Sequence, residues 1–101
     1  MKTEVILNVI DVNNNSKSGY YVIMLSEEPI ENQNLPKMER EIISDSLGIA
    51  KFDLTDYITS SKELFFGAFT KSGDEYVWES TSILQIRMGR ASIFETSITV
   101  K

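Results

Sequence analysis

The oxygen-bearing side chains near the N-terminus have a spacing that could bind a metal ion. Asp11, Asn13 and Asn15 alternate along the chain, and oxygen ligands two residues apart can converge on a hard cation such as Ca²⁺. A lysine stands where the next ligand is needed, and the glycine and closing glutamate of a calcium loop are out of place. We favour an ordinary Asn-rich loop, and keep as the alternative a calcium site completed by Asp45 or Asp74.

Two residue types that carry much of enzyme chemistry are missing. The chain has no histidine and no cysteine, which excludes Ser–His–Asp and Cys–His mechanisms, ordinary zinc sites and disulfides within it. No two carboxylates form a recognisable motif for general acid–base catalysis. We therefore expect no enzymatic activity and no cofactor.

The aromatic and arginine side chains of the second half could form a binding surface. We expect most of the aromatic residues to fill the core. Phe65 and Phe69 share a strand parity, however, and would make an apolar stripe for a partner if that face is open. An exposed Trp78 would instead suit a sugar ring. Arg87 and Arg90 bracket a turn and could hold a carboxylate of a partner, although solubilising charge is the simpler interpretation.

Length and charge restrict the class of protein and its partners. With 101 residues, residues 1–101 are expected to form a single domain. Ten basic and 15 acidic side chains give a net charge of −5, so nucleic acid and anionic membranes are poor partners. No apolar run approaches the roughly 18–20 residues of a membrane span. The compartment stays open: cytoplasmic if Met1 is the native start, otherwise secreted or on the cell surface with a leader removed.

Alternating apolar and polar residues separated by turns predict an all-β protein. Asp45 to Gly48 has the composition of a type I turn, and Ala50, Phe52 and Leu54 then alternate with polar or aliphatic neighbours. Residues 37–44 are charged, as in an edge strand. The prediction is a seven- or eight-stranded antiparallel, Greek-key-like sandwich with strands at 3–12, 20–26, 37–44, 49–54, 63–71, 75–80, 83–88 and 92–101.

The alternation over residues 76–88 does not lose phase. A single strand of this length would span about 40 Å at about 3.3 Å per residue, more than the roughly 26 Å diameter of so small a domain. We therefore expect a bend at residues 80–82, where the chain crosses between sheets. Strand parity then gathers Arg90 and the loops around Asp11 at one end, whereas a single strand would place Arg90 at the opposite end.

The segments VIDVNNNSKSG and DSLGIAKFDL, followed by a closing Ile-Thr-Val strand, resemble the prealbumin-like (transthyretin-like) superfamily. That group includes carboxypeptidase regulatory-like domains and the B-type repeats of bacterial collagen adhesins, and it implies an Ig-like sandwich. Its ureide-hydrolysing members rely on histidines and a Tyr-Arg-Gly-Ser ending, which this chain lacks. Its adhesin repeats often carry a Lys–Asn isopeptide bond that joins the first and last strands. Here every asparagine lies at or before Asn34, so we expect no such bond.

These observations favour a non-catalytic module for protein interaction, adhesion or assembly, which binds through a β-face or edge strand and its end loops. Self-association is one form that this could take. The alternatives are a carbohydrate-binding module that uses exposed aromatic residues and a small protease inhibitor that presents the loop at residues 88–91. The identity of the partner and the oligomeric state do not follow from the residues.

Overall fold

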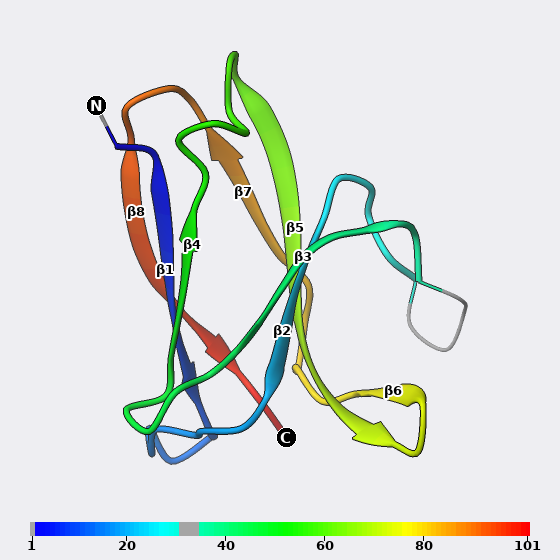
Figure 1. The fold of residues 1–101 in the computed structure, drawn as a ribbon. Coiled ribbons are helices and arrows are strands. Elements are labelled where there is room, and N and C mark those ends of the chain that lie inside the picture. The colour runs from blue at the N-terminus through cyan, green and yellow to red at the C-terminus, as the bar shows by residue number, and fades with distance from the viewer. Residues whose placement is uncertain (1, 31–34) are drawn as a thin grey trace.

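The computed structural model describes residues 2–30 and 35–101 and places eight strands in two sheets packed face to face (Figure 1). The predicted all-β sandwich is therefore confirmed. No helix in the described part of the chain is long and apolar enough to cross a membrane. The strands are β1 (Glu4–Ile10), β2 (Tyr21–Leu25), β3 (Met38–Ile43), β4 (Ile49–Asp53), β5 (Lys62–Ser72), β6 (Glu75–Trp78), β7 (Leu84–Met88) and β8 (Ile93–Thr99).

One sheet has the order β4-β1-β8, and the other has the order β3-β2-β5 followed by β6 and β7, which both pair with β5. The charged strand β3 lies at an edge, as predicted. All pairs are antiparallel except β1 with β8, which is parallel. Strict alternation of direction would make the first and eighth strands antiparallel. It fails because β6 and β7 run in the same direction.

The main core lies between the sheets and follows from the alternation of the strands that face it. Val5, Leu7 and Val9 of β1 are fully buried, and their neighbours in sequence point to the outer face of the sheet. Phe52 of β4 meets Phe66 of β5 across the core, with ring centroids 5.2 Å apart in an edge-to-face contact. Such aromatic pairs add to the burial of apolar surface that holds the two sheets together.

The turn before β4 forms as its sequence predicts. The Asp45 carboxylate accepts hydrogen bonds from the backbone N–H groups of Leu47 and Ile49, both at 2.9 Å. Gly48 has a φ of 79°, which favours glycine. A side chain here would also lie 3.0 Å from the backbone oxygen of Val9 and the backbone nitrogen of Lys17. The glycine therefore lets the turn pack directly against the loop that follows β1.

Between β6 and β7 the chain bends, as predicted, but it does not change sheets. Both strands pair with the same edge of β5, β6 along Phe69–Ser72 and β7 along Lys62–Phe66. Ser80 fills the gap between them: its hydroxyl accepts the N–H of Ala68 at 3.2 Å, and its own N–H donates to the Ala68 carbonyl at 3.1 Å. Ser80 also forms a β-bridge with Val100 of the other sheet. The predicted crossing is thus only a one-residue contact.

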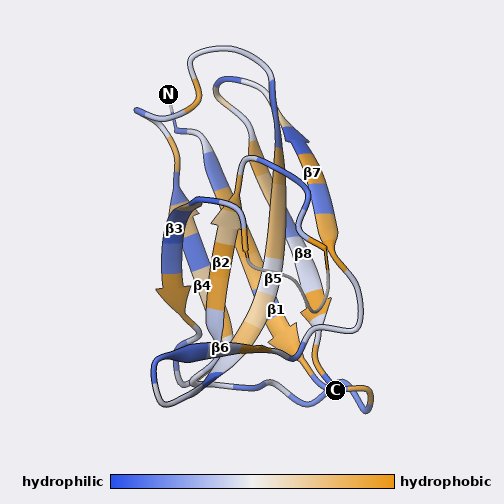
Figure 2. Ribbon diagram, turned by 90° about the vertical axis from the view of Figure 1, so that its right-hand side faces the viewer, coloured by the Kyte–Doolittle hydropathy of each residue, from blue (hydrophilic) through white to orange (hydrophobic). Residues whose placement is uncertain are grey.

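A second, smaller core covers the outer face of the larger sheet. Its four buried residues come from β2 and β5, and five half-buried residues pack over them. Gly67 leaves room for this packing, because a side chain there would lie 2.8 Å from the Phe69 ring. Figure 2 shows the contrast between the hydrophobic central strands β2 and β5 and the largely hydrophilic β3. The cluster consists of Ile23, Leu25, Phe65 and Phe69, covered by Tyr21, Leu35, Tyr76, Trp78 and Ile83.

Candidate functional site

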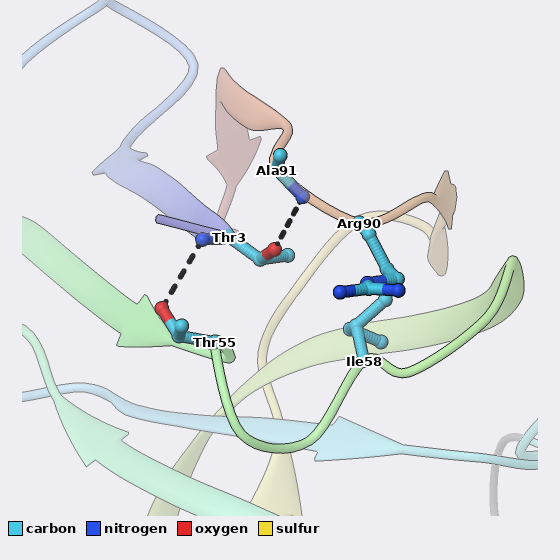
Figure 3. Close-up of a pocket in the computed structure, with 5 residues that line it drawn as sticks. All are labelled: Thr3, Thr55, Ile58, Arg90 and Ala91. Carbon is cyan, nitrogen blue, oxygen red and sulfur yellow. Dashed lines mark hydrogen bonds between the residues drawn. The ribbon is translucent and has the colours of Figure 1, made fainter. Parts of the chain in front are cut away.

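A pocket of about 480 Å³ opens at the end of the sandwich where β1 begins (Figure 3). It is lined by Thr3 before β1, Thr55 and Ile58 after β4, and Arg90 and Ala91 in the turn from β7 to β8. Figure 3 shows these five residues and the two hydrogen bonds that join Thr3 to Ala91 and to Thr55. Arg90 is the one charged residue among the described residues that line the pocket, so the pocket suits an anionic or neutral polar group better than a cation.

Hydrogen bonds between backbone and hydroxyl groups fix the polar wall of this pocket. The Ala91 N–H donates to Thr3 Oγ1 at 2.8 Å, and the Thr3 N–H donates to Thr55 Oγ1 at 3.2 Å. The Thr55 hydroxyl donates to Asp53 Oδ1 at 2.7 Å, and this bond lowers the pKa of the Asp53 carboxyl below its usual value. The network joins three segments of the chain, and the lowered pKa makes Asp53 a poor base for activating the Thr55 hydroxyl.

The backbone of Ala91 is strained, and relieving the strain should stabilise the fold. Its φ of 59° lies in the left-handed region that disfavours residues with a Cβ. We expect Ala91→Gly to raise the free energy of unfolding by roughly 0.5–1 kcal/mol, because the left-handed penalty exceeds the entropy that glycine adds to the unfolded chain. Urea denaturation of both proteins measures this difference. A loss of stability in the glycine variant would contradict the expectation.

The two arginines proposed to bind a partner lie in different surroundings. Arg87 of β7 is ion-paired with Glu63 of β5, with its Nη1 3.3 Å from Glu63 Oε1, so solubilising charge on an outer face explains it. Arg90 lies in the end pocket and forms no ion pair within the described part of the chain. The prediction that Arg90 shares an end with the loop of Asp11 is wrong, because β6 and β7 run in the same direction and carry Arg90 to the opposite end.

The Asn-rich loop that could have bound calcium is organised by hydrogen bonds within itself. Asp11 Oδ1 accepts the backbone N–H groups of Asn13 and Asn15 at 2.8 and 3.0 Å. Asp11 Oδ2 lies 3.3 Å from the Asn15 amide and 3.7 Å from Lys17 Nζ. Asp45 serves its own turn instead, and no group of three or more acidic side chains gathers among residues 2–30 and 35–101. These contacts support the interpretation of this segment as an ordinary Asn-rich loop over the alternative of a calcium site.

Asp11 should make stability depend on acid pH. The Asn15 N–H lowers the pKa of the Asp11 carboxyl, with a smaller contribution from Asn13. A lowered folded-state pKa gives stability that is present above the unfolded-state value of about 3.9 and is lost as the pH falls through the folded-state value. We expect Tm to fall less between pH 5 and pH 2 in Asp11→Asn than in wild type, since the amide keeps an acceptor but does not titrate. Asp74→Asn is the control, because the Asp74 carboxylate accepts no hydrogen bond from the described residues. Its Tm should fall with pH as in wild type. If the fall of Tm between pH 5 and pH 2 were the same in Asp11→Asn as in wild type, the expectation would be contradicted.

The aromatic stripe proposed as a partner surface is not open to solvent. Phe65 and Phe69 do share a face, but they are only 8% and 2% exposed and belong to the second core. Trp78 packs edge-to-face on Phe69 with centroids 4.9 Å apart, and its indole N–H donates to the Ser80 carbonyl at 2.7 Å. The expectation of an exposed stripe is therefore wrong, because Trp78, Tyr76 and the segment before β3 cover that face.

The surface that the sequence interpretation overlooked is the edge strand β8. Ile93 is 63% exposed and Phe94 is 44% exposed. Among the described strands, β1 is the one with which β8 forms a ladder. Neighbouring exposed apolar residues on an open edge are unusual, since natural edge strands are commonly protected by charges, proline or short length. One signal was present in the sequence: the segment Ile93–Thr99 carries a single charge, Glu95, and no lysine or proline.

Comparison with known proteins supports the fold but assigns no family. No family model matches the sequence, and no curated protein is significantly similar to it. Among solved structures, the chain is similar to BcpA, the major pilin subunit of Bacillus cereus, with a TM-score of 0.59 and 13% sequence identity. The similarity covers all of this chain but 30% of the pilin subunit, so the chain spans about a third of that protein. This similarity shows the fold alone: the chain shares its two-sheet β-sandwich with part of that pilin subunit.

Proposed function

We propose that this protein is a non-catalytic interaction module that docks a protein partner during adhesion or the assembly of a larger structure. The observation that carries the proposal is the unprotected edge strand β8, with Ile93 and Phe94 exposed on it. The similarity in fold between this chain and part of a pilin subunit is consistent with such a role. Strand addition at a sheet edge is an established way for β-proteins to bind one another, and it needs no catalytic group.

The two alternatives have less support from the contacts. A carbohydrate-binding surface needs an open aromatic ring, but Trp78 is held by Phe69 and by the Ser80 carbonyl. An inhibitor needs a projecting loop, but the turn at residues 88–91 is tied to Thr3 through the Ala91 N–H. A protein partner is therefore the better proposal.

The proposal is tested by immobilising the whole chain and exposing it to extract of the source cells and, separately, to a glycan array. We expect a discrete protein, identified by mass spectrometry, to be retained in stoichiometric amount, with no glycan bound. Binding to a glycan that is lost on Trp78→Ala would contradict the proposal and favour the carbohydrate alternative. Retention of no protein above a chain-free control would also contradict it.

A further inference from the structure

We propose that β8 accepts an extended segment of a partner protein as an antiparallel strand, with a basic residue opposite Glu95 and apolar residues beside it. This inference rests on the proposed function and specifies its binding site and the chemistry of the partner. The occupant is a strand from a different protein, not a second copy of this chain.

The backbone of β8 has a row of hydrogen-bonding groups that pair with none of the described residues. In a parallel pair, alternate residues bond to the neighbouring strand, and here Ser92 accepts from Glu4 while Val100 donates to Ile10. The even-numbered residues of β8 therefore face β1, and the odd-numbered ones face outward. At the far end, the Thr99 carbonyl accepts from Thr81. The outward groups that no described strand pairs with belong to Ile93, Glu95 and Ser97.

The other sheet edges are protected in ways that β8 is not. Strand β3 carries the charges of residues 39–41, and Arg40 donates to the Asp53 carbonyl at the end of β4. Strand β4, the other edge of the smaller sheet, has five residues and exposes the charged side chains of Lys51 and Asp53. Strand β6 has only four residues, and β7 presents Arg87. Strand β8 has seven residues with one charge. Since exposed edges invite pairing with other chains, the contrast indicates that this edge is kept open for a partner.

The side chains of β8 leave an apolar surface that an added strand would cover. Phe94 pairs with Val5, and residues directly opposite in a parallel ladder point to the same face. It therefore points toward the core, yet it is 44% exposed, because β8 is the last strand of its sheet. An apolar side chain from an added strand would remove the exposed part of the Phe94 ring from water.

The charge of Glu95 determines the partner's chemistry. Its carboxylate points to the outer face, where it accepts a hydrogen bond from the Asn8 amide at 3.1 Å. A basic residue directly opposite would be favourable, and an acidic one unfavourable. Two copies paired symmetrically about Glu95 would place the two carboxylates opposite one another, and each copy carries a net charge of −5. Read along the partner, the residues opposite positions 97 to 93 should be polar, apolar, basic, apolar and apolar.

The probe is a fluorescent ten-residue peptide with the central sequence Thr-Val-Lys-Ile-Val, and the control peptide has glutamate in place of the lysine. Fluorescence anisotropy measures their binding to the whole chain and to three variants. Ser97→Pro removes an outward N–H without touching the β1 ladder, and Ser97→Ala keeps that N–H. Glu95→Lys reverses the charge. Circular dichroism and thermal melting confirm that each variant is folded.

We expect the wild type and Ser97→Ala to bind the lysine peptide about tenfold more tightly than the glutamate peptide, because a favourable cross-strand pair replaces a repulsive one. Glu95→Lys should reverse this preference, and folded Ser97→Pro should bind neither peptide. Equal binding by Ser97→Pro and Ser97→Ala would overturn the inference. So would a wild-type dimer that Ser97→Pro converts to a monomer in sedimentation, because the occupant would then be a second copy.

Capture from source-cell extract separates this inference from the proposed function. A protein partner that is retained equally by wild type and by Ser97→Pro would overturn docking at β8 but would still support the proposed function as an interaction module. A partner that is retained by wild type and Ser97→Ala but lost from Ser97→Pro supports both. If neither the wild-type chain nor any variant retains a protein, the proposed function itself is contradicted.

Discussion

Phe69→Ala is expected to lower the free energy of unfolding by about 3–5 kcal/mol, the usual cost of removing a large aromatic side chain from a packed core. Phe69 is 2% exposed on the outer face of the larger sheet. It contacts Trp78 and Tyr76 through edge-to-face ring pairs at 4.9 and 6.0 Å. Its loss would leave a cavity beneath these covering side chains. Urea denaturation followed by Trp78 fluorescence measures the change.

Phe94→Ala is the matched control for this prediction. Phe94 is also an aromatic residue on a strand, but it is 44% exposed, so its replacement should cost about 1 kcal/mol or less. If Phe69 were instead an open binding residue, the two variants would be equally stable. Equal stability would contradict the second core.

Ser80→Ala is expected to cost about 1–3 kcal/mol, because it leaves a buried backbone N–H without a partner. Ser80 is fully buried, and its hydroxyl accepts the N–H of Ala68 where neither β6 nor β7 reaches β5. The same residue bridges to Val100 of the opposite sheet. Thermal and urea denaturation measure the loss.

Ser82→Ala provides the comparison for Ser80→Ala. Ser82 lies two residues further along the same bend but is exposed, so its replacement should change stability by less than about 0.5 kcal/mol. A cost at Ser80 no larger than that at Ser82 would show that the Ala68 N–H finds another acceptor.

Local patterns predicted the parts of the fold that depend on neighbouring residues in the sequence. Period-2 alternation located every strand, and the composition of residues 45–48 gave the turn whose carboxylate and glycine behave as expected. The charges of residues 37–44 correctly placed β3 at an edge. The β-sandwich implied by the resemblance that DSLGIAKFDL carries agrees with the two sheets of the structure.

The parts that depend on distant residues were not predictable in the same way. Alternation from Tyr76 to Met88 gives the same signal whether the chain changes sheets or returns to the same edge of β5. The difference is made by the Ser80 contacts with Ala68 and Val100, which no local pattern encodes. This single ambiguity decides both the parallel pairing of β8 with β1 and the end at which Arg90 lies.

The prediction of the partner surface was wrong for a related reason. Parity correctly placed Phe65 and Phe69 on one face. Whether that face is open depends on Trp78 and on Leu35, which precedes Phe65 by 30 residues in the sequence. The exposed pair Ile93 and Phe94 was missed because apolar residues in a strand are expected to be buried unless the strand is known to lie at a sheet edge.

Hydrogen exchange at the backbone amides of β8, measured by NMR with and without the lysine peptide, tests most directly whether this strand is the docking edge. In the free chain we expect slow exchange at Phe94, Thr96 and Ile98, which bond to β1, and fast exchange at the outward amides of Ile93, Glu95 and Ser97. Addition of the peptide should slow at least two of the three outward amides and leave the inward ones unchanged. Outward amides that are already protected in the free chain, or that exchange equally fast at saturating peptide, would contradict the account.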